Sequence, residues 1–395
     1  MKIAEIQQSI KEMSADAWVI VDYENRNPTV VSLLGKMMLT RKVFLVIPVS
    51  GRPFIIAHSI DTVFLKTDSI TRDFDICQYN TWQEMLEIEK EKLAPFETVL
   101  MDISEKGLLP RISLADYGSV EFVKSLGKKI KSSGDIQQLL NAKLSFRAYE
   151  LQKLACRKTL KIKDEAFIKI RDDILMNGEA DEYDIQQYIC RRFRDEGMVY
   201  DEAPIVAIGP NASNPHYGPT KEEHSKIHMG DLVLIDMWAK MDDEEGVYAD
   251  ITWMGYVGTK IPKEYVDRFN IVKAARDGVI EFLKEELPKR KVLAYEADDV
   301  ARRIITEAGY GKYFIHRVGH NIGVDVSPHG QGANLDNYES HDDREILNGT
   351  SFSDEPGIYA EDFGMRSETD LHNDNGDLEV IAGLQDEIIP ILALI

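Results

Sequence analysis

Cysteine is scarce in this sequence. Three cysteines occur among 395 residues, and they are widely spaced, at Cys77, Cys156 and Cys190. An odd number of distant cysteines gives neither a disulfide framework nor a cysteine-based zinc motif. Long apolar runs are also missing, since nothing approaches the roughly 20 residues of a membrane span. The start, MKIAEIQQSIKEM, lacks the apolar core of a signal peptide. We therefore expect a cytoplasmic protein with no membrane partner.

Positive charge is in short supply as well. The chain has 47 lysines and arginines against 68 aspartates and glutamates, which gives a formal net charge of −21. Binding of nucleic acid needs clustered basic residues, so nucleic acid is not expected as a partner. The hydrophobic content of 44% is ordinary for a soluble globular protein. A length of 395 residues predicts two domains rather than one.

Hydrophobic spacing predicts a small α/β layer domain in the first third of the chain. Helical patterns lie at Ile3–Met13, Trp82–Lys92 and Leu114–Ser125, and strand patterns at Ala17–Asp22, Val43–Val49, Pro53–His58 and Val99–Asp102. The polar stretch Lys128–Asp135 is the expected inter-domain boundary. We place the domains at residues 1–138 and 139–395. The second has helical patterns at Ala148–Met176, Asp181–Glu196, Pro262–Glu286 and Glu296–Ala308.

The stretch Leu232–Gly258 predicts a β-hairpin with one acid in each arm. LVLIDMWAKM and VYADITWMGYV have strand character, and the polar turn DDEEG joins them. If the hairpin closes around residue 243, Asp236 and Asp250 lie opposite each other on one face. Two like charges held that close repel each other, and a cation bound between them would offset the repulsion. An edge hairpin with two solvated aspartates is the alternative.

Histidines follow in loop-like segments. His216 lies in the Gly/Pro/Asn-rich stretch IVAIGPNASNPHYGP, and loops of this kind often present functional side chains, although a loop histidine is usually a surface residue. In FIHRVGHNIGVDVSPHGQG, His316 and His320 have the spacing of a zincin HExxH motif. That motif is rejected because Arg317 stands where it requires glutamate. The glycines predict a backbone bent tightly around His320 and His329.

Two further acids are embedded near the C-terminus, Glu355 in SFSDEPGIY and Glu368 in FGMRSETD. A kinase interpretation of the neighbouring DFG triplet fails because no glycine-rich phosphate loop exists. Taken together, two aspartates, one histidine and two glutamates form an oxygen-rich set that includes one imidazole. This ligand mix suits Mn, Co, Zn or Fe, and its size suits two ions rather than one.

The order of these residues resembles a known family. Asp236, Asp250, His320, Glu355 and Glu368 match, in sequence, the five metal ligands of the pita-bread metallopeptidases. The flanking text PHYGP, LIDMWA, ADITW, GHNIG, EPGIY and GMRSE is similar to the Xaa-Pro aminopeptidase and prolidase branch. Ala17–Ile47 resembles its creatinase-like N-terminal domain and Lys143–Ile395 its catalytic domain. The resemblance implies an α+β fold: a curved antiparallel sheet covered by helices, preceded by a smaller α/β domain.

The resemblance also implies an activity, namely hydrolysis of Xaa-Pro bonds by a hydroxide shared between two divalent ions. Mn²⁺ is the first expectation, and Co²⁺, Zn²⁺ or Fe²⁺ stay open. Glu355 is the implied proton carrier, and the residues that correspond to the surrounding and substrate-binding positions are His216, His316, His329 and Arg366. A proline-containing peptide is the implied substrate and a homodimer the implied assembly. Dipeptidase and aminopeptidase activity are not distinguished.

Other interpretations remain open on the same residues. A creatinase-like C–N hydrolase shares the fold, but its sites replace carboxylates that are all present here. A lyase on the same metal scaffold is possible because a fold does not fix a reaction. A non-catalytic peptide-binding module of this fold tends to lose ligands, so the intact set argues against it.

The sequence departs from the family pattern in two places. The acidic turn lengthens the interval between Asp236 and Asp250. The interval from His320 to His329 is two residues longer than usual, and it places Ser327 where the second histidine is expected. We favour His329 as the functional residue because the following text, GQGAN, continues as in the family. Pro328 also gives the chain a reason to bend there.

Overall fold

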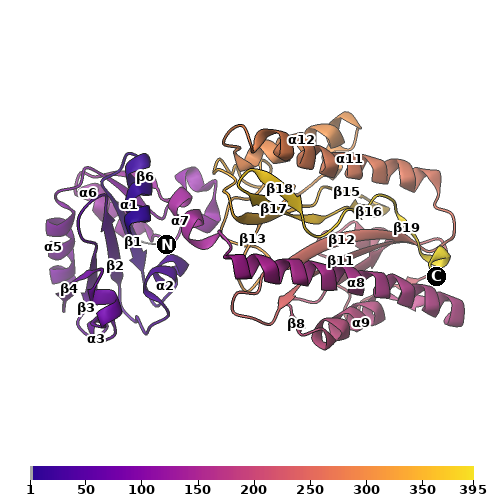
Figure 1. Cartoon of the computed structure of the whole chain (residues 1–395), viewed down its shortest axis with the longest axis horizontal. Coiled ribbons are helices and arrows are strands. Elements are labelled where there is room, and N and C mark those ends of the chain that lie inside the picture. The colour runs from indigo at the N-terminus through magenta and orange to yellow at the C-terminus, as the bar shows by residue number, and fades with distance from the viewer. Residues whose placement is uncertain (1–2) are drawn as a thin grey trace. The chain divides into compact units, whose positions relative to one another are not determined.

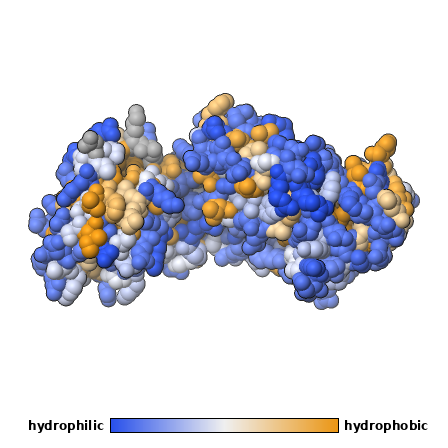
Figure 2. All heavy atoms as spheres, turned by 90° about the horizontal axis from the view of Figure 1, so that it is seen from below, coloured by the Kyte–Doolittle hydropathy of each residue, from blue (hydrophilic) through white to orange (hydrophobic). Residues whose placement is uncertain are grey.

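The computed structural model describes residues 3–395. The chain folds as two separate units, Met1–Asn141 and Ala142–Ile395. Among the described residues, no helix is sufficiently long and apolar to span a bilayer. Hydrophilic residues predominate on the face of both units that is seen in Figure 2, as the strongly acidic composition leads one to expect.

The first unit is built on a six-stranded mixed sheet of order β4-β3-β2-β1-β5-β6. Its strands are β1 (Ala17–Asp22), β2 (Val43–Pro48), β3 (Phe54–His58), β4 (Asp75–Tyr79), β5 (Thr98–Met101) and β6 (Lys129–Ser132). Its helices are α1 (Ile3–Glu12), α2 (Pro28–Leu34), α3 (Thr62–Leu65), α4 (Asp68–Thr71), α5 (Trp82–Leu93), α6 (Tyr117–Ser125) and α7 (Gly134–Asn141). Strand β1 is buried along its whole length because its alternate residues enter two separate apolar cores, one on each face of the sheet.

The expected inter-domain boundary at Lys128–Asp135 was wrong. Residues Lys129–Ser132 form β6 and pair in parallel with β5, and α7 follows directly inside the same unit. The strand KIKS alternates exposed lysines with half-buried residues. An edge strand of this kind has the polar composition of a linker, which explains the error.

The second unit holds two larger sheets, two two-stranded sheets and five α-helices. The first sheet contains β8 (Met198–Val199), β9 (Ile205–Ile208), β11 (Leu232–Met241), β12 (Ala249–Tyr256) and β19 (Ile389–Pro390), and the second contains β13 (Asn321–Ile322), β14 (Thr350–Asp354), β17 (Thr369–Asp374) and β18 (Asp377–Val380). Two smaller pairs are β7 (Ala180–Asp181) with β10 (Lys226–Ile227), and β15 (Gly357–Ala360) with β16 (Phe363–Arg366). The helices are α8 (Phe146–Asn177), α9 (Glu182–Asp195), α10 (Gly209–Ala212), α11 (Lys263–Glu286) and α12 (Ala294–Glu307).

The long helices cover the strands from two sides, with α8 and α9 on one side and α11 and α12 on the other (Figure 1). Strand β11 shows how the sequence produces this layering. Val233, Ile235 and Met237 pack into the core shared with α8 and α9. Leu232 and Leu234 pack into the core shared with α11 and α12. Asp236 follows Leu234 at the strand period of two, and it therefore faces the α11 and α12 side.

The predicted hairpin is present, but its register differs from the expectation. Asp236 lies opposite Thr252, and Asp250 lies opposite Trp238. The two aspartates are therefore diagonal neighbours on the same face, and the expectation that they lie directly opposite each other was wrong by two positions. The indole Nε1 of Trp238, which shares this face, donates a hydrogen bond of 2.7 Å to Asp201 Oδ1.

Candidate metal centre

The five predicted ligands come together where the two sheets of the second unit meet. Asp236 lies on β11 and Asp250 on β12, His320 directly precedes β13, Glu355 directly follows β14, and Glu368 lies between β16 and β17. The Glu368 backbone N–H donates to the Thr252 carbonyl at 3.2 Å, and this bond ties the two sheets together beside the ligands. Residues separated by more than a hundred positions thus share one site.

The distances within this group are short. Nε2 of His320 lies 3.5 Å from Asp250 Oδ2 and 3.5 Å from Glu355 Oε1. One ligand atom each from Asp250, His320 and Glu368 lie within 4.8 Å of one another. Asp236, Asp250, His320 and Glu368 are all buried, with 7% of the surface or less exposed. These four residues are thus largely shielded from solvent, and their ligand atoms have the spacing of ligands around an ion.

The crowding of acids is unfavourable without a cation. Burial raises the pKa of Asp250 and Glu368 well above the usual range, and repulsion among the neighbouring carboxylates raises it further. Oδ1 of Asp236 is buried and has no hydrogen-bond partner among the described residues. Carboxylate oxygens with one imidazole are ligands that first-row divalent metals accept. The donor set and the unpaired oxygen therefore fit divalent cations.

Arg366 is the counter-charge built into the site. Its Nη2 donates to Asp236 Oδ2, and its Nε donates to Thr252 Oγ1 at 2.8 Å and lies 4.0 Å from Glu368 Oε2. The Thr252 hydroxyl in turn donates to Glu368 Oε2 at 2.7 Å. Burial raises the pKa of Asp236, and the positive charge of Arg366 lowers it in part. One guanidinium thus orients two of the predicted ligands.

His316 connects to Arg366 through a residue that the sequence did not indicate. Its Nδ1 lies 2.6 Å from the Arg317 carbonyl and therefore carries the hydrogen. Its Nε2 then accepts from the Tyr359 hydroxyl at 2.8 Å, and Tyr359 accepts from Arg366 Nη1 at 2.8 Å. Burial and the charge of Arg366 lower the pKa of His316 to about 3. The imidazole is therefore neutral and acts as a hydrogen-bond acceptor.

The segment that carries His316 is fixed from helix α12. Asp298 accepts from the Val318 backbone N–H at 2.9 Å and forms an ion pair with Arg302. Arg302 donates to the carbonyls of Phe314 and His316 at 3.0 and 2.8 Å. Irregular backbone has no ladder partners of its own, so these side-chain bonds replace them.

His216 is exposed in the loop after α10. The buried carboxylate of Glu182, the first residue of α9, fixes this loop. It accepts hydrogen bonds from the backbone N–H groups of Ile208 and Ser225, at 2.8 and 2.7 Å, and from the Tyr217 hydroxyl at 2.6 Å. A single buried acid thus determines the conformation of the chain on both sides of His216.

His329 lies against a predicted ligand. Its ring meets the ring of His320 edge to face, with 4.2 Å between the centroids. His329 forms a β-bridge with Ile322, and the six residues between them, 323–328, make a turn. Ser327 lies within this turn. The geometry places the imidazole of His329, at the end of the turn, next to His320.

A second set of buried polar groups lies next to the backbone of Asp250, and the sequence did not predict it. The backbone N–H of Asp250 donates to Asp370 Oδ2 at 3.1 Å, and Cys156 Sγ on α8 lies 3.3 Å from the same oxygen. Burial raises the pKa of Asp370 to about 8. The only available signal was an acid embedded in the strand text SETDLHN, two residues beyond Glu368.

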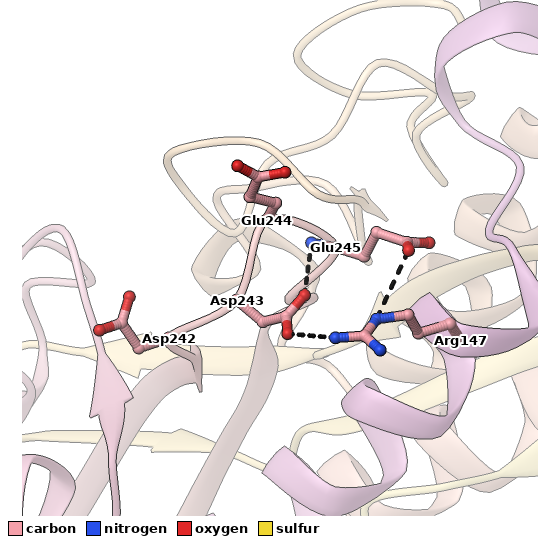
Figure 3. A pocket seen from close by; sticks show the side chains of 5 residues that line it. All are labelled: Arg147, Asp242, Asp243, Glu244 and Glu245. Carbon is pink, nitrogen blue, oxygen red and sulfur yellow. Dashed lines mark hydrogen bonds and ion pairs between the residues drawn. The ribbon is translucent and has the colours of Figure 1, made fainter.

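The acidic turn of the hairpin lies apart from these ligands. A pocket at this turn is lined by Arg147 and by the four acids Asp242, Asp243, Glu244 and Glu245 (Figure 3). Arg147, in the first turn of α8, forms ion pairs with Asp243 and with Glu245, the latter at 3.5 Å. The turn therefore anchors the hairpin to α8, and none of the predicted site residues lines this pocket.

Comparison with known proteins gives consistent matches. Residues 152–373 match the family described as metallopeptidase family M24. The Xaa-Pro dipeptidase of Lactobacillus helveticus is 34% identical over 203 residues, which are 51% of this chain and 49% of the relative. The chain therefore spans about half the length of that relative. The Xaa-Pro dipeptidase of Pyrococcus horikoshii is 25% identical over 367 residues, 92% of this chain and 91% of the relative.

A solved structure matches nearly the whole chain. The dipeptidase PepE from Mycobacterium ulcerans has a TM-score of 0.69 at 20% sequence identity, and the match covers 98% of this chain and 96% of the other. At this identity the likeness shows the fold. The expected α+β architecture, a pita-bread unit preceded by a smaller α/β unit, is confirmed.

Proposed function

The chain belongs to metallopeptidase family M24, and on this premise we propose that it hydrolyses Xaa-Pro peptide bonds with the help of two divalent cations. One observation carries the proposal: four carboxylates and one imidazole converge in a largely buried site beside the guanidinium of Arg366. The names of two relatives as Xaa-Pro dipeptidases support the prolyl substrate class.

The cations would be held by Asp236, Asp250, His320, Glu355 and Glu368. Asp250, His320 and Glu368 would hold one ion together, because one ligand atom from each lies within 4.8 Å of the others. The chemistry that such a pair supplies is Lewis acidity, which polarises a carbonyl and makes water nucleophilic near neutral pH. The oxygen-rich donor set suits Mn²⁺, with Co²⁺, Zn²⁺ and Fe²⁺ as alternatives.

The protein's own groups would move the protons. Glu355 would take a proton from the attacking water and deliver it to the departing prolyl nitrogen. Ser353 Oγ donates to Glu355 Oε1 at 3.1 Å and holds the carboxylate in place. His216 and His329 would donate hydrogen bonds to the oxyanion of the tetrahedral intermediate.

Arg366 and His316 would act on the site's geometry. Arg366 holds Asp236 and, through Thr252, Glu368. His316 accepts the hydrogen bond that fixes Tyr359, and Tyr359 in turn fixes Arg366. Loss of Arg366, His316 or Tyr359 would therefore loosen the metal ligands without removing one of them.

The remaining parts of the proposal rest on the resemblance to the Xaa-Pro branch. We assign the first unit, which ends at Asn141 after α7 rather than at residue 138, to a creatinase-like N-terminal domain and the second unit to the catalytic domain. We also propose a cytoplasmic homodimer. Light scattering on the purified protein tests the assembly, and a mass of one chain, 44.9 kDa, would refute it.

A hydrolysis panel tests the function. Xaa-Pro dipeptides, longer Xaa-Pro peptides and the non-prolyl controls Ala-Ala and Met-Ala are assayed with Mn²⁺, Co²⁺, Zn²⁺ and Fe²⁺. We expect prolyl substrates to be cleaved well above the controls, and chain length to separate dipeptidase from aminopeptidase activity. Equal cleavage of prolyl and non-prolyl peptides would refute the substrate class. Peptide binding without cleavage under every metal would refute the enzymatic proposal.

A further inference from the structure

The position of His329 depends on the turn formed by residues 323–328. Residues 323–328 connect Ile322 to His329, and the two ends are joined by a β-bridge and by a 2.7 Å bond from the Gly330 N–H to the Asn321 carbonyl. The two ends are therefore fixed, whereas the conformation of the six residues between them must be set by other contacts. A change in that conformation would strain the bridge that holds His329.

Apolar burial holds the end of this turn, where Pro328 is buried, but not its middle. Val324 and Val326 are 43% and 87% exposed, so both side chains leave much of their surface in water. A turn of six residues with two exposed valines gains little from the hydrophobic effect. The ordering of residues 324–326 therefore depends on hydrogen bonds to their backbone.

Two side chains of the hairpin segment supply those bonds. Lys240 Nζ lies 2.8 Å from the Asp325 carbonyl and 3.3 Å from the Val324 carbonyl. The Tyr248 hydroxyl donates to the Val326 carbonyl at 2.8 Å. Three consecutive carbonyls are thus bound by two residues, and the Lys240 ammonium also lies 5.3 Å from the centre of the Tyr248 ring.

The same hairpin carries two predicted metal ligands. Lys240 is four positions after Asp236 on β11, so both side chains are on one face of the strand. Tyr248 is two positions before Asp250 and directly precedes β12. The hairpin therefore sets the distance between the ligands and the turn that ends at His329.

We propose that Lys240 and Tyr248 are positioning residues, which fix the turn 323–328 and thereby hold His329 against His320. The inference rests on the proposed role of His329 in hydrolysis. Whether Lys240 and Tyr248 order the turn can be measured without any substrate.

Four variants of the full-length protein test this. Lys240→Met removes the ammonium and Tyr248→Phe removes one hydroxyl. Lys240→Arg keeps a cationic donor, and Lys263→Met is the control, because Lys263 is an exposed residue paired with Asp267 at the start of α11. Hydrogen exchange of residues 323–330, bound manganese, kcat and KM for an Xaa-Pro dipeptide are measured for each.

We expect faster exchange in the turn for Lys240→Met and Tyr248→Phe, with unchanged manganese content. Turnover should fall by about tenfold, the effect of one lost hydrogen bond on a positioned group, with KM within about twofold of wild type. Lys240→Arg should recover most of the turnover, and Lys263→Met should match wild type.

Two results would overturn the proposal. Unchanged exchange in the turn would mean that these residues do not order it. A raised KM with unchanged kcat would make Lys240 a substrate-binding residue instead. Failure of the proposed function would look different, since the wild-type protein would then cleave no prolyl peptide while exchange in the turn still rose in both variants.

Discussion

Glu89 is a buried acid that should make the first unit less stable as the pH rises. It lies on α5 with 1% of its surface exposed, and its Oε1 has no hydrogen-bond partner among the described residues. Burial raises the pKa of this carboxyl to about 8, and the charge of Lys42 opposes the shift only in part. The folded protein thus keeps this proton at neutral pH, whereas the unfolded chain releases it.

The sign and the size of the effect follow from these two pKa values. Between the ordinary pKa of 4.5 and the folded value of about 8, the folded state binds more protons than the unfolded state, so the free energy of unfolding falls with rising pH. Each pH unit in this window contributes about 1.4 kcal/mol. Between about pH 5 and about pH 7.5, the titration of Glu89 should therefore lower the free energy of unfolding by about 3 kcal/mol. Glutamine does not titrate, so Glu89→Gln should abolish this component.

Urea unfolding of the full chain, with hydrogen exchange in β1 and β2 as the probe of the first unit, measures the effect at both pH values. The quantity compared is the difference in the free energy of unfolding between the two pH values. Any effect of the buried glutamine amide that does not depend on pH cancels in this difference. Glu87→Gln, at an exposed position on the same helix, is the control and should keep the wild-type dependence. An identical pH dependence in wild type and Glu89→Gln would refute the reasoning.

Three predictions concern the candidate metal centre. Asp250→Asn should yield folded protein with reduced metal content and almost no hydrolysis; two tightly bound ions and normal turnover, measured by metal analysis and assay, would contradict the assignment. His329→Ala should lower turnover on the order of a hundredfold with unchanged metal content, while Ser327→Ala stays near wild type; the reverse result would move the catalytic position to Ser327. Removal of the metal by a chelator should lower the melting temperature of the second unit. The expected decrease is roughly 5–10 °C for each site, if the free metal concentration had been about a hundredfold above the Kd of that site. Equal melting curves with and without manganese would argue against bound ions.

The sequence was most informative where a regular period was long and unbroken. The first arm of the hairpin was predicted at residues 232–241 and is observed as Leu232–Met241. The register of the two arms was wrong because it depends on the turn. That turn is tight, since a Cβ on Gly246 would lie 2.3 Å from the Met241 carbonyl oxygen, and it is tied to Arg147 on a different element. No local pattern contains such a long-range contact.

The charged residues of the candidate site stood out in the sequence, whereas the hydroxyls that connect them did not. An acid inside an apolar strand is unusual and therefore conspicuous, as at Asp236 and Asp250. Thr252 and Tyr359 are ordinary strand residues by composition, and their roles appear only when Arg366 is placed beside both. Residues that orient other residues have no sequence pattern of their own.

Trp238 gives this hairpin an optical property. Its indole ring is on the ligand-bearing face of β11, lies opposite Asp250 in the strand register and is fixed through Nε1 to Asp201. A paramagnetic ion at Asp250 would quench the fluorescence of a fixed indole so close by, whereas diamagnetic Zn²⁺ would not. The chain thus contains an intrinsic fluorophore beside the proposed ions, and a single Trp238→Phe variant separates its emission from that of the other three tryptophans.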